Sequence, residues 1–581
     1  MHCQGVKGEQ RPIKPDDWPA RRSNAAVKVK RGWLRNAFAL FWSGNPSRML
    51  LPSQYEDGFS RSALPPLGQW PEMIFELPGL RFPDRFNCAD ELLSTGARIA
   101  GGHAAAIVSD QQQLTYAELT GLVNRIAHAL TEDCALRTGE RVLLRGTNAP
   151  GLLAAWLAVV KAGGIAVTTM PMLRVGELEK IIEVSRPRLA LCEQGLVGEL
   201  TPCLGHAGFE RIVEFGGANS ELEQLSADKA PEYPAFAASQ DDVCLIAFTS
   251  GTTGKPKAAM HFHRDVMAIC RTFAQHRLPH CERPVFSGTP PLGFTFGLGA
   301  LLLFPLFLGG SVALPAPTGP QQLPEAVRRF GITHLFTSPT AYRAMLEGQD
   351  LGLPSLQVAV AAGEHLPADT ALAWKEATGL DLLNGLGATE MLHIFLSTDA
   401  GSPSNGGLGK PVPGFTAALF DPAGNSIAGP GEGRLGVKGP VGCRYLDDPR
   451  QSDYVVNGWN MTGDIFRRDA DGNYSFVSRA DDIIVSSGYN IAAIEVEQAV
   501  LQHPDVAECA VLGVPDSKRG KVVKALVVPR SGVEPDEGLA LQIQTFVKNT
   551  IAPYKYPRAI EFVSTLPRTV TGKISRNHAP K

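Results

Sequence analysis

The strongest chemical signal in the sequence is a run of small hydroxyl residues, glycines and lysines directly after an apolar strand. The strand is predicted at residues 243–248, and the run that follows it is Thr249-Ser250-Gly251-Thr252-Thr253-Gly254-Lys255-Pro256-Lys257. Hydroxyl groups and the N–H groups of glycine-rich turns hydrogen-bond phosphate oxygens, and lysine adds positive charge. In a Walker A loop the lysine is followed by serine or threonine at the start of a helix, whereas here Lys255 is followed by Pro256. The run therefore predicts a phosphate-binding loop and excludes a kinase-like or GTPase-like interpretation.

Further along the chain, turn-forming segments carry acidic and basic side chains. Glu364 follows a strand predicted at residues 357–361, and Glu390 ends the segment Asn384-Gly385-Leu386-Gly387-Ala388-Thr389-Glu390. Later segments are Thr462-Gly463-Asp464, then Ser478-Arg479-Ala480-Asp481-Asp482, and finally PRTVTGKI with Lys573. A carboxylate oxygen suits a hard cation such as Mg²⁺, and a lysine suits the charge that develops on an attacked phosphate. Each segment alone is typical of an ordinary turn, so their order carries the information.

In this order the motifs resemble the adenylate-forming superfamily of acyl-CoA synthetases, luciferases and peptide-synthetase adenylation domains. The resemblance extends over residues 85–576 and implies a role for each matching position. It implies phosphate binding by Thr249, Ser250, Gly251, Thr252, Thr253, Gly254 and Lys255, adenine contact by Gly363 and Glu364, α-phosphate contact by Thr389, Mg²⁺ binding by Glu390, ribose contact by Asp464 and Arg479, and a catalytic lysine at Lys573.

The resemblance also implies a hinge at Asp481 and a pantetheine tunnel near Gly488. The cations that could meet the CoA phosphates are Lys518, Arg519, Lys521 and Lys524, and a solvated charged surface is the alternative for them. Some positions depart from the family pattern: Leu386 replaces a common tyrosine, Ser478 a glycine, Val485 a lysine and Ala493 a proline.

The acid pocket is expected around the segment PLGFTFGLG, where the resemblance places Phe294 at an aromatic gate. An aromatic ring suits a flat, apolar acid, and glycines let a ring approach the backbone. The other expected pocket residues are Thr295, Thr340, Gly387 and His393. For Phe294 and His393 an ordinary place in the core is the alternative.

The segment QWPEMIFELPGLRFPDRFNCADELL, at residues 69–93, resembles the 2-aminobenzoate-CoA ligase group within the benzoate-CoA ligase branch. Nothing in the spacing reveals an ortho amino group on the acid. Thr295, Thr340 and His393 remain equal candidates to hydrogen-bond such a group.

The resemblance implies an ATP-dependent aryl-acid:CoA ligase. Carboxylate and MgATP would give an aryl-adenylate and pyrophosphate, and the CoA thiol would then displace AMP. The acid expected is 2-aminobenzoate or benzoate. The alternatives are a stand-alone adenylation enzyme that loads a carrier protein, a medium-chain acyl-CoA synthetase, and a non-catalytic ligand sensor with the same fold. The oligomeric state is left open.

Alternating strand and helix patterns must position these motifs. Strands at residues 141–145 and 165–169 flank a helix at 151–162, and this βαβ pattern recurs. We therefore predict an α/β protein: a large N-terminal domain of helix-covered mixed sheets at residues 49–480, and a small, mobile α+β C-terminal domain at 481–581. Residues 1–48 are predicted to be a flexible or spurious extension.

Composition excludes several other classes of protein. The chain has 581 residues, with 55 Lys and Arg against 58 Asp and Glu, so its formal charge of −3 gives no field to hold nucleic acid or an anionic membrane. The 10 cysteines lie far apart and are expected to be reduced thiols. The apolar run at residues 297–310 is too short for a membrane span and is broken by glycine and proline. With no signal-peptide core, a cytoplasmic location is expected.

Overall fold

A computed structural model describes most of the chain from residue 50 onward. The chain divides into two compact units, Met1–Met49 and Leu50–Lys581, and the described residues all belong to the second. The predicted extension at residues 1–48 lies outside them. The described ranges are 50–217, 219–249, 256–316, 319–348, 351–403, 406–479, 483–486, 489–516, 520–551 and 555–568.

A six-stranded sheet holds the strand that leads into the predicted phosphate loop. Its order is β6-β5-β3-β4-β7-β8, parallel except for β8, which runs antiparallel to β7. The predicted βαβ unit is confirmed, because β3 and β4 pair in parallel around α4. The bounds are β3 (Arg141–Arg145), β4 (Ile165–Thr169), β5 (Leu189–Glu193), β6 (Arg211–Phe215), β7 (Val243–Thr249), β8 (Lys257–Phe262), α4 (Pro150–Lys161) and α5 (Val175–Ser185).

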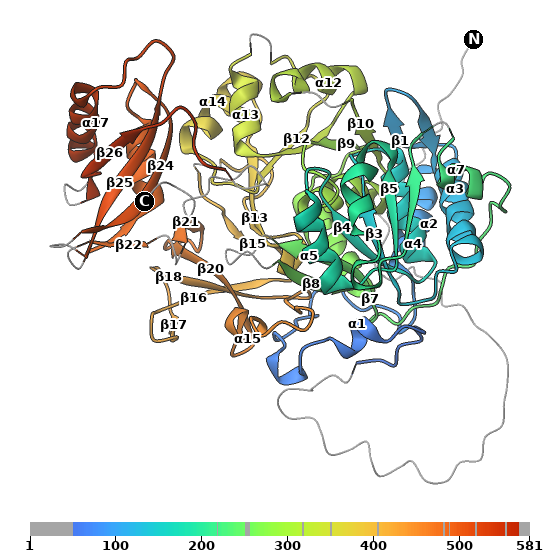
Figure 1. Cartoon of the computed structure of the whole chain (residues 1–581). Helices are drawn as coiled ribbons and strands as arrows, with labels where there is room; N and C mark the ends of the chain where they lie inside the picture. The colour runs from blue at the N-terminus through green and yellow to red at the C-terminus, as the bar shows by residue number, and fades with distance from the viewer. Residues whose placement is uncertain are drawn as a thin grey trace, which may run out of the picture. The chain divides into compact units, whose positions relative to one another are not determined.

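A nine-stranded sheet carries the predicted motifs around Phe294, Glu364 and Glu390. Its order is β15-β14-β13-β12-β11-β9-β10-β1-β2, and the strands from β13 to β1 are parallel (Figure 1). The bounds are β1 (Ala105–Ser109), β2 (Gln113–Thr115), β9 (Val285–Gly288), β10 (Ser311–Leu314), β11 (His334–Thr337), β12 (Val358–Ala362), β13 (Leu382–Gly387), β14 (Ile394–Ser397) and β15 (Lys410–Pro411).

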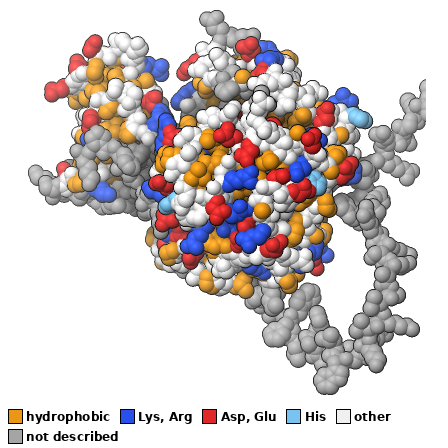
Figure 2. All heavy atoms as spheres, turned by 45° about the vertical axis from the view of Figure 1, so that its right-hand side comes forward, with side chains coloured by type: hydrophobic (Ala, Val, Ile, Leu, Met, Phe, Trp, Pro, Cys, Tyr) orange, Lys and Arg blue, Asp and Glu red, His pale blue; other side chains and the backbone are white. Residues whose placement is uncertain are grey.

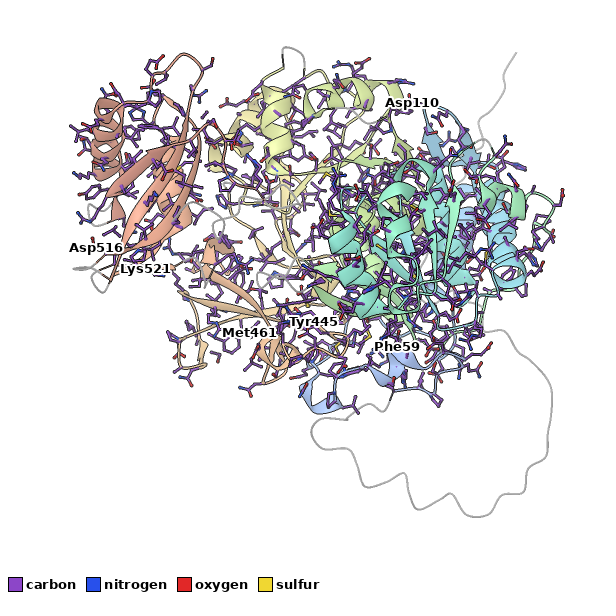
Figure 3. The ribbon with its side chains drawn as sticks, in the orientation of Figure 1. Phe59, Asp110, Tyr445, Met461, Asp516 and Lys521 are labelled. Atoms are coloured by element: carbon purple, nitrogen blue, oxygen red, sulfur yellow. The ribbon has the colours of Figure 1, made fainter. Side chains whose placement is uncertain are left out.

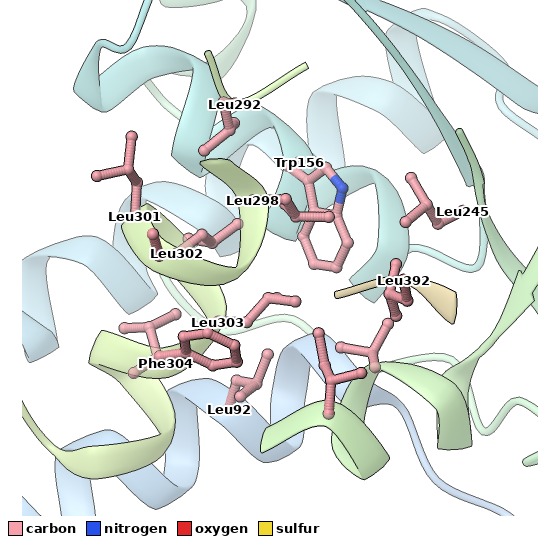
Figure 4. Packing of buried hydrophobic residues seen from close by; sticks show 14 of the residues in the cluster. Leu92, Trp156, Leu245, Leu292, Leu298, Leu301, Leu302, Leu303, Phe304 and Leu392 are labelled. Carbon is pink, nitrogen blue, oxygen red and sulfur yellow. The ribbon is translucent and has the colours of Figure 1, made fainter. Parts of the chain in front are cut away.

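The hydrophobic core of this region is formed by helices that pack on the two sheets. Leu92 of α2, Trp156 of α4 and Leu298 of α10 belong to one buried cluster (Figure 4). The apolar run at residues 297–310 forms part of this core, as α10 (Thr295–Leu298), a π-helical turn (Gly299–Leu303) and α11 (Phe304–Leu308). None of the described helices is long and apolar enough to cross a membrane.

The remaining helices follow or precede strands of these sheets. Their bounds are α1 (Phe59–Ser62), α2 (Cys88–Ala100), α3 (Tyr116–His128), α6 (Val197–Leu200), α7 (Glu221–Ser226), α8 (His263–Ile269), α9 (Gln275–Arg277), α12 (Leu323–Phe330), α13 (Pro339–Leu346), α14 (Ala368–Thr378) and α15 (Gln451–Tyr454).

A third sheet is entirely antiparallel and carries the predicted ribose-binding residues. Its order is β17-β16-β18-β20-β19, with β21 paired to β20. The bounds are β16 (Thr416–Phe420), β17 (Ser426–Ile427), β18 (Gly431–Lys438), β19 (Val455–Val456), β20 (Trp459–Arg468) and β21 (Tyr474–Arg479). The strand and helix rhythm of the sequence does not predict this sheet.

The last part of the chain forms a small α+β unit with its own core. Val496, Val511 and Ile543 belong to one buried cluster, which is separate from the larger hydrophobic cores. The predicted fold class is therefore confirmed, whereas the boundary at residues 480 and 481 lies outside the described residues. The bounds are β22 (Ile483–Ser486), β23 (Tyr489–Ala492), α16 (Ala493–Leu501), β24 (Val506–Asp516), β25 (Gly520–Pro529), α17 (Glu537–Thr550) and β26 (Ala559–Phe562).

Surface charge and cysteine state agree with the composition. Acidic and basic side chains are interspersed over the face drawn in Figure 2, which suits a formal charge of −3. The nine cysteines in the described part of the chain are all free thiols. The structure therefore presents no field of one sign on this face.

Candidate functional site

Four neighbouring parallel strands deliver part of the predicted site residues to one edge of the nine-stranded sheet. The strands β9, β11, β12 and β13 are consecutive in the sheet, and their carboxyl ends meet at that edge. In open α/β sheets, ligands bind outside the carboxyl ends of parallel strands. Phe294 and Thr295 follow β9, Thr340 follows β11, Gly363 and Glu364 follow β12, and Gly387, Thr389 and Glu390 end or follow β13.

Thr340 and Glu364 form one hydrogen-bonded pair across two of these strand ends. The Thr340 hydroxyl donates to Glu364 Oε2 at 2.6 Å, and the Thr340 backbone N–H donates to the same oxygen at 3.3 Å. Gly363, beside them, has φ +89°, a conformation that side chains rarely adopt, and the space where a Cβ would stand is open. This turn therefore offers an open backbone edge to a flat ligand, and the Thr340 proton is already used by Glu364.

The turn Thr389–Met391 is held by two side chains from elsewhere in the chain. Glu390 is buried, and Tyr445 donates its hydroxyl proton to Glu390 Oε1 at 2.5 Å. His261 Nε2–H donates to the Thr389 carbonyl oxygen at 2.8 Å. Burial lowers the pKa of His261 to about 4, so its ring is neutral at neutral pH.

The Glu390 carboxylate fits a magnesium ion by its chemistry. Among the described residues its only hydrogen bond comes from Tyr445 to Oε1, so Oε2 remains available for a cation. Burial and the negative charge of Glu390 raise the pKa of Tyr445, which therefore stays protonated and keeps donating. Sequence reasoning found Glu390 but missed Tyr445 and His261, because no motif links residues so far apart.

His393 lies in a cluster of phenylalanine rings. Its ring centroid is 4.6 Å from that of Phe304, 5.1 Å from Phe273 and 5.7 Å from Phe296. The side chain is buried, and within the described residues neither ring nitrogen makes a hydrogen bond of ordinary geometry. Burial lowers the pKa of His393 to about 3, opposed in part by the Phe296 backbone. A neutral, buried imidazole is therefore surrounded by aromatic rings.

Two other predicted pocket residues differ in their relation to this cluster. Gly387 approaches it closely, because a Cβ at this glycine would lie 2.9 Å from the carbonyl carbon and oxygen of His393. Phe294 caps the start of α10 and is half-buried, and it stacks on no other described ring. Phe296, two residues later, makes the ring contact to His393 instead. The aromatic segment was therefore found from the sequence, but not which ring meets His393.

Asp464 and Arg479 face each other on the antiparallel sheet. They are register partners on β20 and β21, and Arg479 Nη1 lies 4.0 Å from Asp464 Oδ1. The structure thus brings together the two residues expected to bind ribose, because β20 and β21 pair as an antiparallel hairpin.

The predicted phosphate loop joins β7 to β8. Thr249, which ends β7, pairs with Lys257 at the start of β8, and the Lys257 ammonium lies 5.3 Å from the ring centroid of Tyr445. The loop therefore starts and ends on the strand pair that also supports Glu390. Ser250, Gly251, Thr252, Thr253, Gly254 and Lys255 lie outside the described residues, as do Asp481, Gly488 and Lys573.

The candidate CoA cations are only partly described. Lys524 pairs with Glu561 at 2.6 Å, so its charge is already matched, and Lys521 is exposed. Lys518 and Arg519 lie outside the described residues. A binding role for these cations stays a prediction.

A cavity of about 360 Å³ lies near the amino ends of β12 and β13. It is lined by Val358 of β12 and Leu383 of β13, together with Lys375 and Asp381. The predicted site residues that follow β9, β11, β12 and β13 lie at the opposite, carboxyl ends of these strands, so we do not assign this cavity to the candidate site.

Two family models match the chain. The AMP-binding enzyme model matches residues 97–445, and the AMP-binding enzyme C-terminal domain model matches residues 495–573. The first match includes all four strand ends of the candidate site.

The chain is similar over most of its length to proteins named as CoA ligases of aromatic acids. It is 35% identical to benzoate–CoA ligase of Thauera aromatica, covering 86% of this chain and 96% of the relative. It is 32% identical to 3-hydroxybenzoate–CoA ligase of Aromatoleum sp. strain CIB, covering 84% and 95%. The crystal structure of the anthranilate CoA ligase AuaEII with anthranoyl-AMP superposes with a TM-score of 0.79 at 31% identity, covering 85% and 96%.

Proposed function

Because the chain belongs to the AMP-binding enzyme family and is an acid–thiol ligase within it, we propose that it joins an aromatic carboxylic acid to coenzyme A. The observation that carries the proposal is the convergence of Glu364, Glu390 and the aromatic surrounding of His393 at one sheet edge. That edge brings groups suited to a nucleotide next to an aromatic cluster.

The proposed reaction has two steps. A carboxylate oxygen of the acid attacks the α-phosphorus of ATP, the bond to the bridging oxygen breaks, and pyrophosphate leaves. The CoA thiol then loses its proton and its sulfur attacks the acyl carbon, and the carbon–oxygen bond to AMP breaks. The mixed anhydride makes AMP the leaving group, so the closed site must exclude water from it.

We propose the residue roles from the resemblance of the sequence motifs to those of the family. The loop from Thr249 to Lys255 binds phosphates, Gly363 and Glu364 border the adenine, and Asp464 and Arg479 bind ribose. Thr389 contacts the α-phosphate, and Lys573 stabilises the charge of the first transition state. Glu390 would hold Mg²⁺, which supplies charge neutralisation to the phosphates when bound.

The ring cluster around His393 supports an aromatic carboxylic acid as the substrate. Phenylalanine faces and edges suit an aromatic ring, and a neutral imidazole can donate or accept a hydrogen bond to a ring substituent. The relatives are named for benzoate, 3-hydroxybenzoate and anthranilate. We therefore propose 2-aminobenzoate or benzoate as the acid.

An acid panel tests the proposed activity. The full chain is assayed with ATP, Mg²⁺ and CoA against 2-aminobenzoate, benzoate, 3-hydroxybenzoate and a medium-chain fatty acid, with pyrophosphate, AMP and thioester measured. An aromatic acid is expected to give the highest kcat/KM and to yield AMP. Preference for the fatty acid, formation of ADP, or adenylation without transfer to free CoA would each contradict the proposal.

A variant of the lysine loop tests the order of steps. Lys573→Ala is expected to cripple pyrophosphate release while a supplied aryl-adenylate is still converted to thioester. Lys410→Ala, at an exposed position on β15, is the matched control and should retain both activities. Equal loss of both half-reactions in Lys573→Ala would contradict the assigned role.

A further inference from the structure

The strand β8 and residues 443–446 form a two-stranded support beneath the turn Thr389–Met391. Ala259 and Tyr445 form an antiparallel bridge, the Met260 N–H donates to the Arg444 carbonyl at 2.8 Å, and the Leu446 N–H donates to the Ala258 carbonyl at 2.9 Å. We call this pair of segments the support. Because β8 begins where the predicted phosphate loop ends, the support is continuous with that loop.

Tyr445 reaches from the support to the carboxylate of Glu390. Its backbone is held from the other side, because its N–H donates to Gln451 Oε1 at 2.9 Å. Its ring packs against Tyr454 with centroids 5.8 Å apart. These contacts restrict the Tyr445 side chain, whose place in the chain is labelled in Figure 3. Its hydroxyl donates to Glu390 Oε1 at 2.5 Å.

His261 reaches from the support to the backbone of the same turn. Both the His261 ring and Asp265, whose Oδ2 lies 4.0 Å from Nδ1, are fully buried. A carbonyl oxygen only accepts, so the 2.8 Å contact to Thr389 assigns the proton to His261 Nε2. One side chain thus fixes the backbone of the turn and the other fixes its carboxylate.

We propose that Tyr445 and His261 are positioning residues that orient the Thr389–Glu390 turn toward a divalent cation and the phosphates of the nucleotide. The proposal rests on the proposed function in one respect, namely that Glu390 binds the cation. Tyr445 holds one carboxylate oxygen so that the other faces the cation, and His261 keeps the peptide plane from rotating. Partners of this kind, one step removed from a metal ligand, orient the ligand and tune metal affinity.

Cation binding without turnover tests the role of Tyr445. Mn²⁺ is titrated into the full chain with α,β-methylene-ATP, and bound Mn²⁺ is measured by electron paramagnetic resonance. Tyr445→Phe removes only the hydroxyl and is expected to weaken Mn²⁺ binding by about tenfold to a hundredfold. Tyr454→Phe is the matched control: Tyr454 is buried in the same small cluster, its hydroxyl has no partner among the described residues, and its loss should leave the affinity unchanged.

A pair of variants tests His261. His261→Ala removes the donor to the Thr389 carbonyl and is expected to weaken Mn²⁺ binding by about tenfold. His261→Gln keeps an N–H donor at a similar reach and is expected to restore most of the affinity. A purely space-filling role for His261 predicts no such rescue by Gln.

The outcomes separate this inference from the function on which it rests. If Glu390→Gln leaves Mn²⁺ affinity unchanged, Glu390 is not the ligand and the proposed role of that residue fails. If Glu390→Gln weakens binding but Tyr445→Phe and Tyr454→Phe both match the unmodified chain, the positioning role of Tyr445 is wrong. Circular dichroism melting of each variant verifies that it is folded, and an unfolded Tyr445→Phe would equally contradict a role confined to positioning.

Discussion

The buried, unpaired ring of His393 makes a quantitative prediction about stability. The residue is 2% exposed, it is surrounded by Phe273, Phe296 and Phe304, and neither nitrogen makes a hydrogen bond of ordinary geometry in the described part of the chain. Replacement by phenylalanine keeps a planar ring and removes both polar atoms. We expect His393→Phe to stabilise the ligand-free protein while weakening recognition of the acid.

The expected gain in the free energy of unfolding for His393→Phe has a pH-independent and a pH-dependent part. Burying a polar group without a hydrogen bond costs about 1–3 kcal/mol, which the variant avoids at any pH. The folded pKa of His393 is lowered from 6.5 to about 3. Below pH 6.5 the unfolded chain takes up a proton that the folded chain refuses, so stability falls as the pH falls. At one pH unit below the unfolded pKa this amounts to about 1.4 kcal/mol.

Urea unfolding at two pH values measures both parts. The advantage of His393→Phe over the unmodified chain is expected to be about 1–3 kcal/mol near pH 7.5 and about 1.4 kcal/mol larger near pH 5.5. Phe415→Leu alters the same hydrophobic core at a ring that packs against Phe395 and not against His393, so its effect on the free energy of unfolding should not depend on pH. The KM for the aromatic acid should rise in His393→Phe.

A pH-independent difference between His393→Phe and the unmodified chain would refute this reasoning. It would mean that the imidazole is protonated in the folded protein or is reached by water. Unchanged KM for every acid in the panel would separately refute contact between His393 and the substrate.

Two further predictions concern buried contacts beside the site. Gly387→Ala places a Cβ 2.9 Å from the His393 carbonyl group, so we expect a loss of about 1–3 kcal/mol in urea unfolding and a higher KM for the acid, whereas Gly176→Ala, where nothing lies within 4 Å, should lose neither. Asp265→Ala leaves the fully buried Arg444 without its 2.7 Å partner, and we expect a loss of about 3–5 kcal/mol by urea unfolding. A change below about 1 kcal/mol in either variant would contradict the contact concerned.

The elements predicted from local patterns agree with the structure. The strands expected at residues 141–145 and 165–169 are β3 and β4 with the same bounds, and the helix expected at 151–162 is α4 (Pro150–Lys161). Apolar periodicity and a glycine stop are local signals, so they are readable without the fold. The antiparallel sheet that carries Asp464 was not predicted, because its pairing depends on contacts between distant strands.

The candidate site also combines features that the sequence predicts with features that only the fold reveals. The types and order of residues such as Glu390 and Glu364 were sufficient to indicate a nucleotide site and the family, because each motif is a short run whose chemistry does not depend on the rest of the chain. Only the tertiary structure places Tyr445 on Glu390 and His261 on the Thr389 carbonyl, across 55 and 128 residues of sequence. Hydrogen bonds between distant residues leave no periodic trace, since their geometry is set by strand pairing and by burial. The sequence alone therefore predicted which groups do chemistry, and the fold decided how the described ones among them are held.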